Sequence, residues 1–278
     1  MELSKFLNDK QDLNLLKRFS TLGSKDAFDK KLNYLTNIAD NEKWYYERED
    51  DETFSVIFYY IIHTFDRVFK QNKLVINDDE NVCIFNTGLL SNQGDEILGI
   101  FEKSFNYNSN NPSSNYWHFS TFLLENDRKF LNYSLNKPEI ATYFDNFNEL
   151  YFDPNTEISL NFDHFYDDNY DRLPTELKTL EKSTARIVFN GFLEHTVKKI
   201  KRNNRIPVPQ FYREKIMFLI PVRILGTRTV VIAVEKLGDR YVANTVLTMD
   251  MAYNCARLLN KPESNWLLIP DEQNKKNS

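Results

Sequence analysis

Apolar residues recur at roughly helical spacing through the first quarter of the chain. The first run covers residues 3–16, and Gly23 ends it. Ser24 can cap a second helix over about residues 25–39, because a serine side chain accepts a hydrogen bond from a free N–H of the first turn. A third apolar stretch predicts a helix over about residues 53–70.

From residue 74 onward, short apolar runs bounded by turn residues predict strands. These runs cover residues 82–86, 116–124, 150–152, 158–160, 216–225, 230–235 and 241–247. Gly238-Asp239 separates the last two runs and predicts a hairpin. Residues 175–200 return to helical spacing, and Thr248 can cap a last helix that runs to Leu259.

The order of these elements favours an α+β fold, in which N-terminal helices precede a mainly antiparallel sheet with packed helices. One sheet is expected to contain residues 82–86, 216–225, 230–235 and 241–247, with the helix 175–200 on one face. No Pro/Gly/Ser-rich linker divides the 278 residues. We therefore predict a single domain over residues 1–270, with residues 1–40 as a helical extension and 271–278 as a disordered tail.

Composition predicts a cytoplasmic protein. Its two cysteines, Cys83 and Cys255, are too few and too far apart for a disulfide framework or a zinc site. The charged N-terminus lacks the apolar region of a signal peptide. No apolar run approaches the roughly 20 residues of a membrane helix, so no membrane partner is expected.

Charge is unevenly spread along the chain. Residues 178–228 carry 12 Lys and Arg against 3 Asp and Glu, a net charge of +9. Residues 1–177 carry 17 against 31, a net charge of −14. This asymmetry indicates an anionic partner for the basic segment or an internal docking of the two halves. The acidic N-terminal half could also bind a protein partner.

The basic segment near residues 198–215 is a candidate nucleic-acid interface. Its cations are Lys198, Lys199, Lys201, Arg202, Arg205 and Arg213. Phe211 and Tyr212 are interleaved with them, and aromatic rings stack on bases while cations neutralise phosphates. RNA or a nucleotide is the expected ligand. The alternative is a solvated basic surface that pairs with the acidic half.

Asn86, Thr87 and Gly88 follow an apolar strand and form a second candidate. Backbone N–H groups, a hydroxyl and an amide at one corner can cradle a phosphate. The Gly-rich run and the Lys-Ser/Thr pair of a P-loop are absent from this segment. The alternative is a structural turn in which Gly88 supplies a positive φ.

Asp163, His164, Asp167 and Asp168 form an acidic cluster with one histidine. Carboxylates with an imidazole can ligate a divalent metal, but the spacing matches no standard motif, so no metal is assigned. His164 could instead act as a general base near Arg172, and these two are the catalytic candidates. The simpler alternative is a polar helix start.

Further ligand-binding candidates are Gln210, Tyr212, Asn254 and Arg257. Asn254 and Arg257 are three residues apart and share a helix face, where they could bind a ligand or bond neighbouring loops. We predict that at least four of seven polar residues line one concave pocket with apolar walls and a basic rim. The seven are Asn86, Thr87, His164, Arg172, Gln210, Tyr212 and Asn254.

Three sequence blocks together carry a family resemblance. They are FNTGL at residues 85–89, PQFY at 209–212 and LTMDMAYNCARLL at 247–259, with Arg172-Leu173-Pro174 between the first and second. In this order the chain resembles the bacterial family called domain of unknown function 3825, over roughly residues 40–268. The resemblance implies an association with RNA-binding modules such as cold-shock and LOTUS-type domains.

Three functions remain open at this point. The first, which the charge segregation favours, is an RNA- or nucleotide-binding domain that uses the basic segment and a polar pocket. The second is an enzyme that acts on a phosphate-containing substrate, with no cofactor identified. The third is a scaffold that binds another protein.

Overall fold

The computed structural model describes residues 3–47, 53–224 and 228–267. The chain folds as two compact units, Met1–Thr142 and Tyr143–Ser278. This division differs from the single domain over residues 1–270 expected from the sequence. The boundary lies in a stretch without helix or strand, and its composition carries none of the Gly/Ser enrichment that signals a linker. The tail expected at 271–278 lies outside the described residues.

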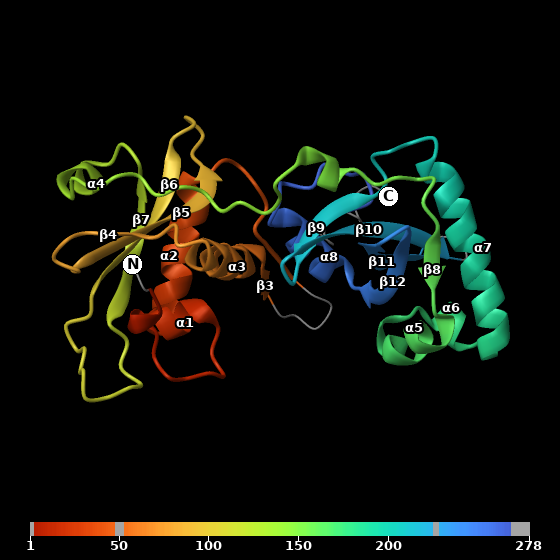
Figure 1. Ribbon diagram of the computed structural model, residues 1–278, viewed down its shortest axis with the longest axis horizontal. Helices are drawn as coiled ribbons and strands as arrows, with labels where there is room; N and C mark the ends of the chain where they lie inside the picture. Colours follow the sequence, from red (N-terminus) through yellow and green to blue (C-terminus); the bar gives the residue numbers. More distant parts are fainter. Residues whose placement is uncertain (1–2, 48–52, 225–227, 268–278) are drawn as a thin grey trace. The chain divides into compact units, whose positions relative to one another are not determined.

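The first unit contains a five-stranded sheet in the order β1-β7-β6-β5-β4 (Figure 1). Its strands are β1 (Ser20–Thr21), β4 (Val75–Ile76), β5 (Val82–Leu90), β6 (Glu96–Lys103) and β7 (Trp117–Leu124), and β2 (Tyr45–Glu47) pairs separately with β3 (Thr53–Ser55). Its helices are η1 (Leu3–Phe6), α1 (Leu15–Phe19), α2 (Lys25–Ile38), α3 (Val56–Lys70) and α4 (Arg128–Asn132). All pairs in the larger sheet are antiparallel except β1 with β7.

Aromatic rings form much of the core in the first unit. Phe19 lies 5.2 Å from both Phe65 and Phe101, measured between ring centroids, and all three are fully buried. They bring α1, α3 and β6 together. The predicted second helix is confirmed as α2, because the side chain of Ser24 accepts from the N–H of Ala27. The third begins later than predicted, since residues 53–55 form β3 and Ser55 is the cap.

The second unit contains another five-stranded sheet, in the order β8-β12-β11-β10-β9. Its strands are β8 (Ile158–Leu160), β9 (Val208–Tyr212), β10 (Lys215–Ile224), β11 (Arg228–Leu237) and β12 (Arg240–Leu247). Its helices are η2 (Phe147–Leu150), α5 (Phe162–Asp168), η3 (Tyr170–Arg172), α6 (Thr175–Lys178), α7 (Lys182–Ile200) and α8 (Met249–Arg257). The β8–β12 pair is parallel and the other pairs are antiparallel.

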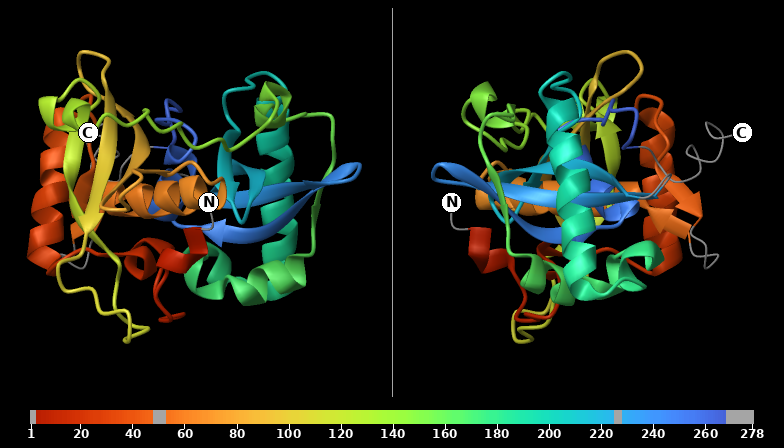
Figure 2. Two further views of the ribbon diagram at one scale, coloured as in Figure 1. Left: turned by 60° about the vertical axis from the view of Figure 1, so that its left-hand side comes forward. Right: turned by 90° about the vertical axis from the view of Figure 1, so that its right-hand side faces the viewer.

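Helices cover both faces of this second sheet. One face of the sheet packs against α7, which crosses the strands in Figure 2. Phe189 of α7 packs there with Phe218, Ile220 and Ile232. Neighbouring strand residues point to the opposite face, because side chains alternate along a strand. Met217 lies on that face, which α8 partly covers.

The α+β class is confirmed, but several element assignments were wrong. Residues 82–86 belong to the first sheet, not to the sheet of residues 216–247. The helix expected over 175–200 is interrupted after Lys178 and forms α6 and α7. Residues 3–16 form only η1 and the start of α1, and 150–152 form no strand. The hairpin at Gly238 is confirmed by the β11–β12 pairing.

Among the longer strands, β6 and β9 were missed. A central strand that is buried on both faces shows no alternation of polar and apolar residues, which explains β6. Pro209 concealed β9, because proline within a run argues against an interior strand. β9 lies at the edge of its sheet, where proline is tolerated. Within the described ranges, no helix is both long and apolar enough to cross a membrane.

Candidate functional site

A cleft of about 700 Å³ lies on the α8 face of the second sheet. Strands β9 to β12 contribute its floor, α8 contributes one wall, and η3 reaches its rim. The lining residues are Arg172, Gln210, Tyr212, Arg213, Lys215, Met217, Ala233, Glu235, Thr245, Leu247, Met251 and Cys255. Pockets of this size hold small molecules and cofactors in many proteins.

Strand register explains why the floor residues meet. Gln210 of β9 pairs with Met217 of β10, and Ala233 of β11 pairs with Thr245 of β12. Residues paired across neighbouring strands point to the same face of a sheet. The register therefore presents two polar and two small or apolar side chains at one place.

Gln210 is the most unusual residue of the floor. Only 1% of its surface is exposed, and its Oε1 is a buried acceptor that has no hydrogen-bond partner among the described residues. Leaving such a group unsatisfied costs about 1–3 kcal/mol. Buried polar groups nearly always have partners, so an unpartnered amide in a cleft marks a place where a ligand could bind.

The walls beside Gln210 are apolar. Met217 is buried, whereas Met251 at the entrance on α8 is 44% exposed. Cys255 lies one helical turn further along α8, and burial raises the pKa of its thiol to about 11. The thiol is therefore protonated near neutral pH and is a weak nucleophile, because reactivity requires the thiolate.

Arg172 is held at the rim by the unit's own backbone. Its Nη1 donates to the carbonyl of Val246 at 2.6 Å. The neighbouring Asn169 is buried and accepts at Oδ1 from both the Val246 N–H and the Thr245 hydroxyl, each at 3.0 Å. These bonds fix η3 against β12, so they also fix the position of the Arg172 guanidinium.

Arg213 is the most available cation of the cleft. The other cation from this hairpin, Lys215, pairs with Glu235 at 2.5 Å. The Arg213 guanidinium lies 5.2 Å from the centroid of the Tyr212 ring, and it has no ion pair within the described part of the chain. Tyr212 is 46% exposed. A cation and an aromatic face are thus presented together at the cleft entrance.

The turn that carries Arg213 is strained. Tyr212 pairs with Lys215, so Arg213 and Glu214 form a two-residue hairpin turn, with φ of 47° and 64°. Positive φ at both positions is typical of a type I′ turn, which favours Asn-Gly. A residue with a Cβ in this region costs roughly 1–2 kcal/mol. The chain thus keeps two unfavourable residues where a better turn sequence is available.

This arrangement suits recognition of a flat, polar, negatively charged molecule. The Gln210 amide can bond a polar ring edge, while Met217 and Met251 contact its apolar faces. Tyr212 offers a stacking surface, and Arg213 offers charge for a phosphate or carboxylate. Among the described lining residues there is one carboxylate, Glu235, and that group is already paired with Lys215.

Three of the seven residues expected to share a pocket line this cleft, namely Arg172, Gln210 and Tyr212. The expected number was at least four. Asn254 lies on α8 but is not among the lining residues, although its Oδ1 is buried and lacks a partner among the described residues. Arg257 is half-buried near the end of the same helix.

The Asn86 corner is occupied by the first unit itself. Asn86 donates through Nδ2 to Glu96 Oε2 at 2.6 Å and accepts at Oδ1 from the N–H of Gly88. The Thr87 hydroxyl donates to the carbonyl of Ile97 at 2.7 Å. Asn86 and Thr87 are fully buried, and Gly88 has a φ of 72°. The geometry is that of a bulge within β5, with its polar atoms already used.

The acidic cluster lies on the surface of α5. His164 is exposed and does not line the cleft. Asp163 and Asp167 both pair with Lys182, at 3.6 and 2.8 Å. Among the residues that the structure describes, no group of three or more His, Cys, Asp or Glu side chains could hold a metal ion.

The basic segment is divided between two places. Arg213 lines the cleft beside α8, while Lys198 and Lys201 line a different hollow between α7 and β8. Arg202 donates to the carbonyl of Lys198 at 2.6 Å and so closes the end of α7. The remaining predicted nucleic-acid contacts, Lys199 and Arg205, are exposed.

Sequence reasoning missed Met251, Cys255, Thr245 and Glu235 as residues of the site. Cys255 was considered only with Cys83, as a cysteine too distant from the other for a disulfide framework or a zinc site. Thr245 lies next to a bulge near the end of β12. The face of the sheet to which its side chain points depends on that bulge. The alternation of side chains within 241–247 therefore indicates the correct face of the sheet only for the residues before the bulge.

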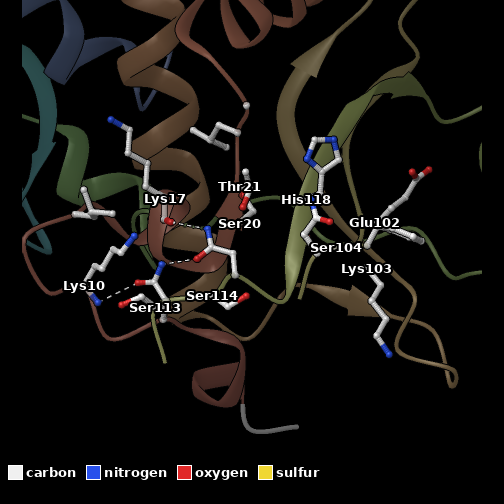
Figure 3. Close-up of a pocket in the computed structure, with 17 residues that line it drawn as sticks. Lys10, Lys17, Ser20, Thr21, Glu102, Lys103, Ser104, Ser113, Ser114 and His118 are labelled. Atoms are coloured by element: carbon white, nitrogen blue, oxygen red, sulfur yellow. Dashed lines mark hydrogen bonds between the residues drawn. The ribbon is translucent and has the colours of Figure 1, made fainter. Parts of the chain in front are cut away.

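The first unit has a cleft of similar volume, about 700 Å³, between its N-terminal segment and the loop after β6. Figure 3 shows that the side chains of Lys17 and Lys103 point away from each other. Two amides of this cleft bond within the unit: Asn115 donates to the carbonyl of Lys17 at 3.0 Å and contacts Asn8. These amide groups are therefore already used within the first unit.

One comparison with known proteins gives a match. The model of a protein family described as Domain of unknown function (DUF3825) matches residues 35–266. This range contains every lining residue of the second-unit cleft, whereas residues 8–23 of the first-unit cleft precede it. The resemblance seen in the FNTGL, PQFY and LTMDMAYNCARLL blocks is confirmed. No curated protein and no solved structure matches the chain significantly.

Proposed function

The chain belongs to the DUF3825 family of domains of unknown function, and from that premise we propose that its second unit binds nucleotides, free or within single-stranded RNA. The α8-face cleft is the binding site, and the nearby cations extend it. The protein performs this role in the cytoplasm, in keeping with its two unpaired cysteines.

The observation that carries this proposal is the unpartnered amide of Gln210. It lies in a mostly apolar floor, 1% exposed, where an unused acceptor is costly unless a ligand satisfies it. A nucleobase has a polar edge and two apolar faces. It therefore matches a cleft that combines the Gln210 amide with Met217 and Met251 better than an aliphatic anion does.

The entrance supports the same ligand. Tyr212 is half-exposed with Arg213 against its ring, and base stacking on aromatic side chains contributes about 1–3 kcal/mol per base. Arg213 supplies charge for the phosphate of the bound nucleotide. The exposed Lys199, Arg202 and Arg205 would add sequence-independent attraction to an RNA backbone.

The cleft favours binding over catalysis. His164 lies elsewhere, Arg172 is engaged with the Val246 carbonyl, and Glu235 is paired with Lys215. The Cys255 thiol, with its pKa raised to about 11 by burial, stays protonated near neutral pH. These lining groups provide recognition and no activated nucleophile.

Fluorescence polarisation with a labelled, mixed-sequence single-stranded RNA tests this function. We expect saturable binding that weakens as salt rises from about 50 to 200 mM, because phosphate contacts release counterions. Nucleoside monophosphates should compete with the RNA for the cleft. Arg213→Ala should weaken the binding of both ligands, whereas Lys10→Ala in the first-unit cleft should change the affinity for neither.

The proposal is wrong if neither RNA nor millimolar nucleoside monophosphate binds at low salt. It is also wrong if binding is equal in the wild type and in Arg213→Ala with Tyr212→Ala. Equal loss in the Lys10→Ala control would transfer the site to the first unit.

A further inference from the structure

We infer that the α8-face cleft binds two separated phosphate groups at once, one at Arg172 and one at Arg213, and therefore prefers a segment of two or more nucleotides to a mononucleotide. This inference rests on the proposed function and specifies its ligand. It derives from the charges that line the cleft and from their separation on the sheet.

Two positive charges in this cleft are uncompensated. Three cations and one carboxylate line it, and the carboxylate of Glu235 pairs with Lys215 at 2.5 Å. The two remaining cations, Arg172 and Arg213, are exposed and have no ion pair within the described part of the chain. The cleft therefore attracts a ligand that carries more than one negative charge.

Arg172 has hydrogen-bonding capacity that the protein does not use. Both of its bonds involve Nη1, which donates to the Val246 carbonyl at 2.6 Å and to the Thr245 hydroxyl at 3.4 Å. Its Nη2 and Nε have no acceptor among the described residues, and a guanidinium can bind a phosphate through two parallel N–H bonds. Because the bonds of Nη1 already hold the side chain, binding a phosphate there costs little further side-chain entropy.

The two arginines lie at opposite ends of the cleft floor. The strand register aligns Thr245 of β12, which Arg172 contacts, with Leu219 of β10. Arg213 lies in the turn just before Lys215, which is four residues from Leu219 along β10. Four residues at about 3.4 Å each along the strand, and two strand spacings of about 4.8 Å, place the two ends roughly 17 Å apart.

A single phosphate cannot occupy both ends. The Arg172 guanidinium is bonded to the Val246 carbonyl. The Arg213 guanidinium lies 5.2 Å from the centroid of the Tyr212 ring, so it remains at the other end. In a nucleotide chain, successive phosphates are separated by a sugar that carries a base, and Met217 offers that base an apolar contact on the floor between the arginines.

Three ligands test this inference by calorimetry on the 278-residue chain. The dinucleotide ApA has two bases and one phosphate, and its 5′-phosphorylated form, pApA, adds a second phosphate at a distance. ADP has two adjacent phosphates and nearly the same total charge as pApA. We expect pApA to bind at least about tenfold more tightly than ApA or ADP, about 1.4 kcal/mol, because pApA alone of the three contacts both arginines.

Arg172→Gln assigns the second phosphate to its residue. In this variant the affinity for pApA should fall to that for ApA, while the affinity for ApA changes by less than about threefold, because Arg213 still binds one phosphate. Arg172→Lys keeps the charge without the planar fork and should retain part of the preference. The control is Arg186→Gln, at an exposed arginine of α7 on the opposite face of the sheet, which should keep the full preference.

The outcomes separate the two claims. Equal affinities for ApA and pApA would overturn the inference, and so would ADP binding as tightly as pApA, since charge alone would then explain the affinity. A loss of equal factor for ApA and pApA in Arg172→Gln would also overturn it, because Arg172 would then act only on the structure of the unit.

Absence of binding by all three ligands and by RNA would overturn the proposed function, and the inference with it. If Arg172→Gln does not fold, Arg172→Lys repeats the test at the same residue, and the wild-type comparison of ApA, pApA and ADP still decides the inference.

Discussion

The two clefts of this protein have the same volume, about 700 Å³, and very different chemistry. In the first unit, loop side chains bond to one another, as Asn115 does to Asn8 and to the Lys17 carbonyl. In the second, a sheet holds Gln210 in place with its oxygen unpaired among the described residues. Unsatisfied bonding capacity on a rigid floor therefore distinguishes the second cleft from the first, which their equal volumes do not.

Truncating one core phenylalanine in each unit should have the largest effect on stability. It should also give the clearest difference in nucleotide affinity between the two units. Phe101 in the first unit and Phe189 in the second are both fully buried, and Phe→Ala typically costs about 3–5 kcal/mol. Both variants should melt at lower temperature in calorimetry. Below its transition, Phe101→Ala should keep the wild-type nucleotide affinity, whereas Phe189→Ala should lose affinity because α7 supports the sheet. Equal loss of affinity would contradict a site built by the second unit alone.

Charge reversal at cations of each cleft should have the next largest effect. Arg213→Glu should weaken RNA binding at least tenfold, about 1.4 kcal/mol, because the entrance would then repel phosphate. The slope of log affinity against log salt concentration should decrease in magnitude by about one, which corresponds to the loss of one phosphate contact. Lys10→Glu with Lys17→Glu makes a larger charge change in the first-unit cleft and should leave the polarisation curve unchanged. A larger loss in that double variant would reverse the comparison.

Relief of the strained turn should separate stability from binding. Arg213→Asn should raise the free energy of unfolding by about 1 kcal/mol, because asparagine tolerates a positive φ better than arginine does. The same variant should bind RNA more weakly. Ser134 in the first unit has a φ of 52°, so Ser134→Asn should stabilise without changing affinity. Urea titration measures the first effect, and an Arg213→Asn variant that is less stable would refute the strain argument.

The smallest expected effect concerns Cys255, whose rate of alkylation should depend on pH. Burial raises its pKa from 9.0 to about 11, so the folded thiol keeps its proton after the unfolded thiol has ionised. The associated stability is complete below pH 9 and is lost as pH rises toward 11. Alkylation by iodoacetamide should be slow at pH 8 and accelerate up to about pH 11, and AMP should slow it. Cys83→Ser makes Cys255 the only thiol measured.

Local signals in the sequence were sufficient for elements defined by their own ends. Ser24 located the start of α2, and Gly238-Asp239 located the hairpin between β11 and β12. Long-range pairing was not predictable in this way. β5 was expected beside the C-terminal strands, and it pairs with β4 and β6 instead, because apolar periodicity identifies a strand and says nothing about its partner.

The candidate site was predictable only in part. Gln210, Tyr212 and Arg213 were identified because they are close in sequence and combine aromatic, amide and basic groups. Met251 and Cys255 were missed because their position depends on which face of α8 meets the sheet. The availability of the Asn86 corner to a ligand was overestimated. The sequence does not show that the Asn86 amide donates to Glu96 and accepts from the N–H of Gly88.

The second sheet also has a consequence for how the chain folds. β9 to β12 are joined in sequence order as three hairpins, and the turns that the structure describes, between β9 and β10 and between β11 and β12, have two residues each. Their contacts are local, so the entropy lost on closing each loop is small. β8 pairs with β12 across about eighty residues, as Ser159 with Val242 shows. We expect the four strands that form the cleft floor to assemble first and β8 to close the far edge late, so that the slow kinetic phase of refolding reports on β8 and leaves the floor already formed.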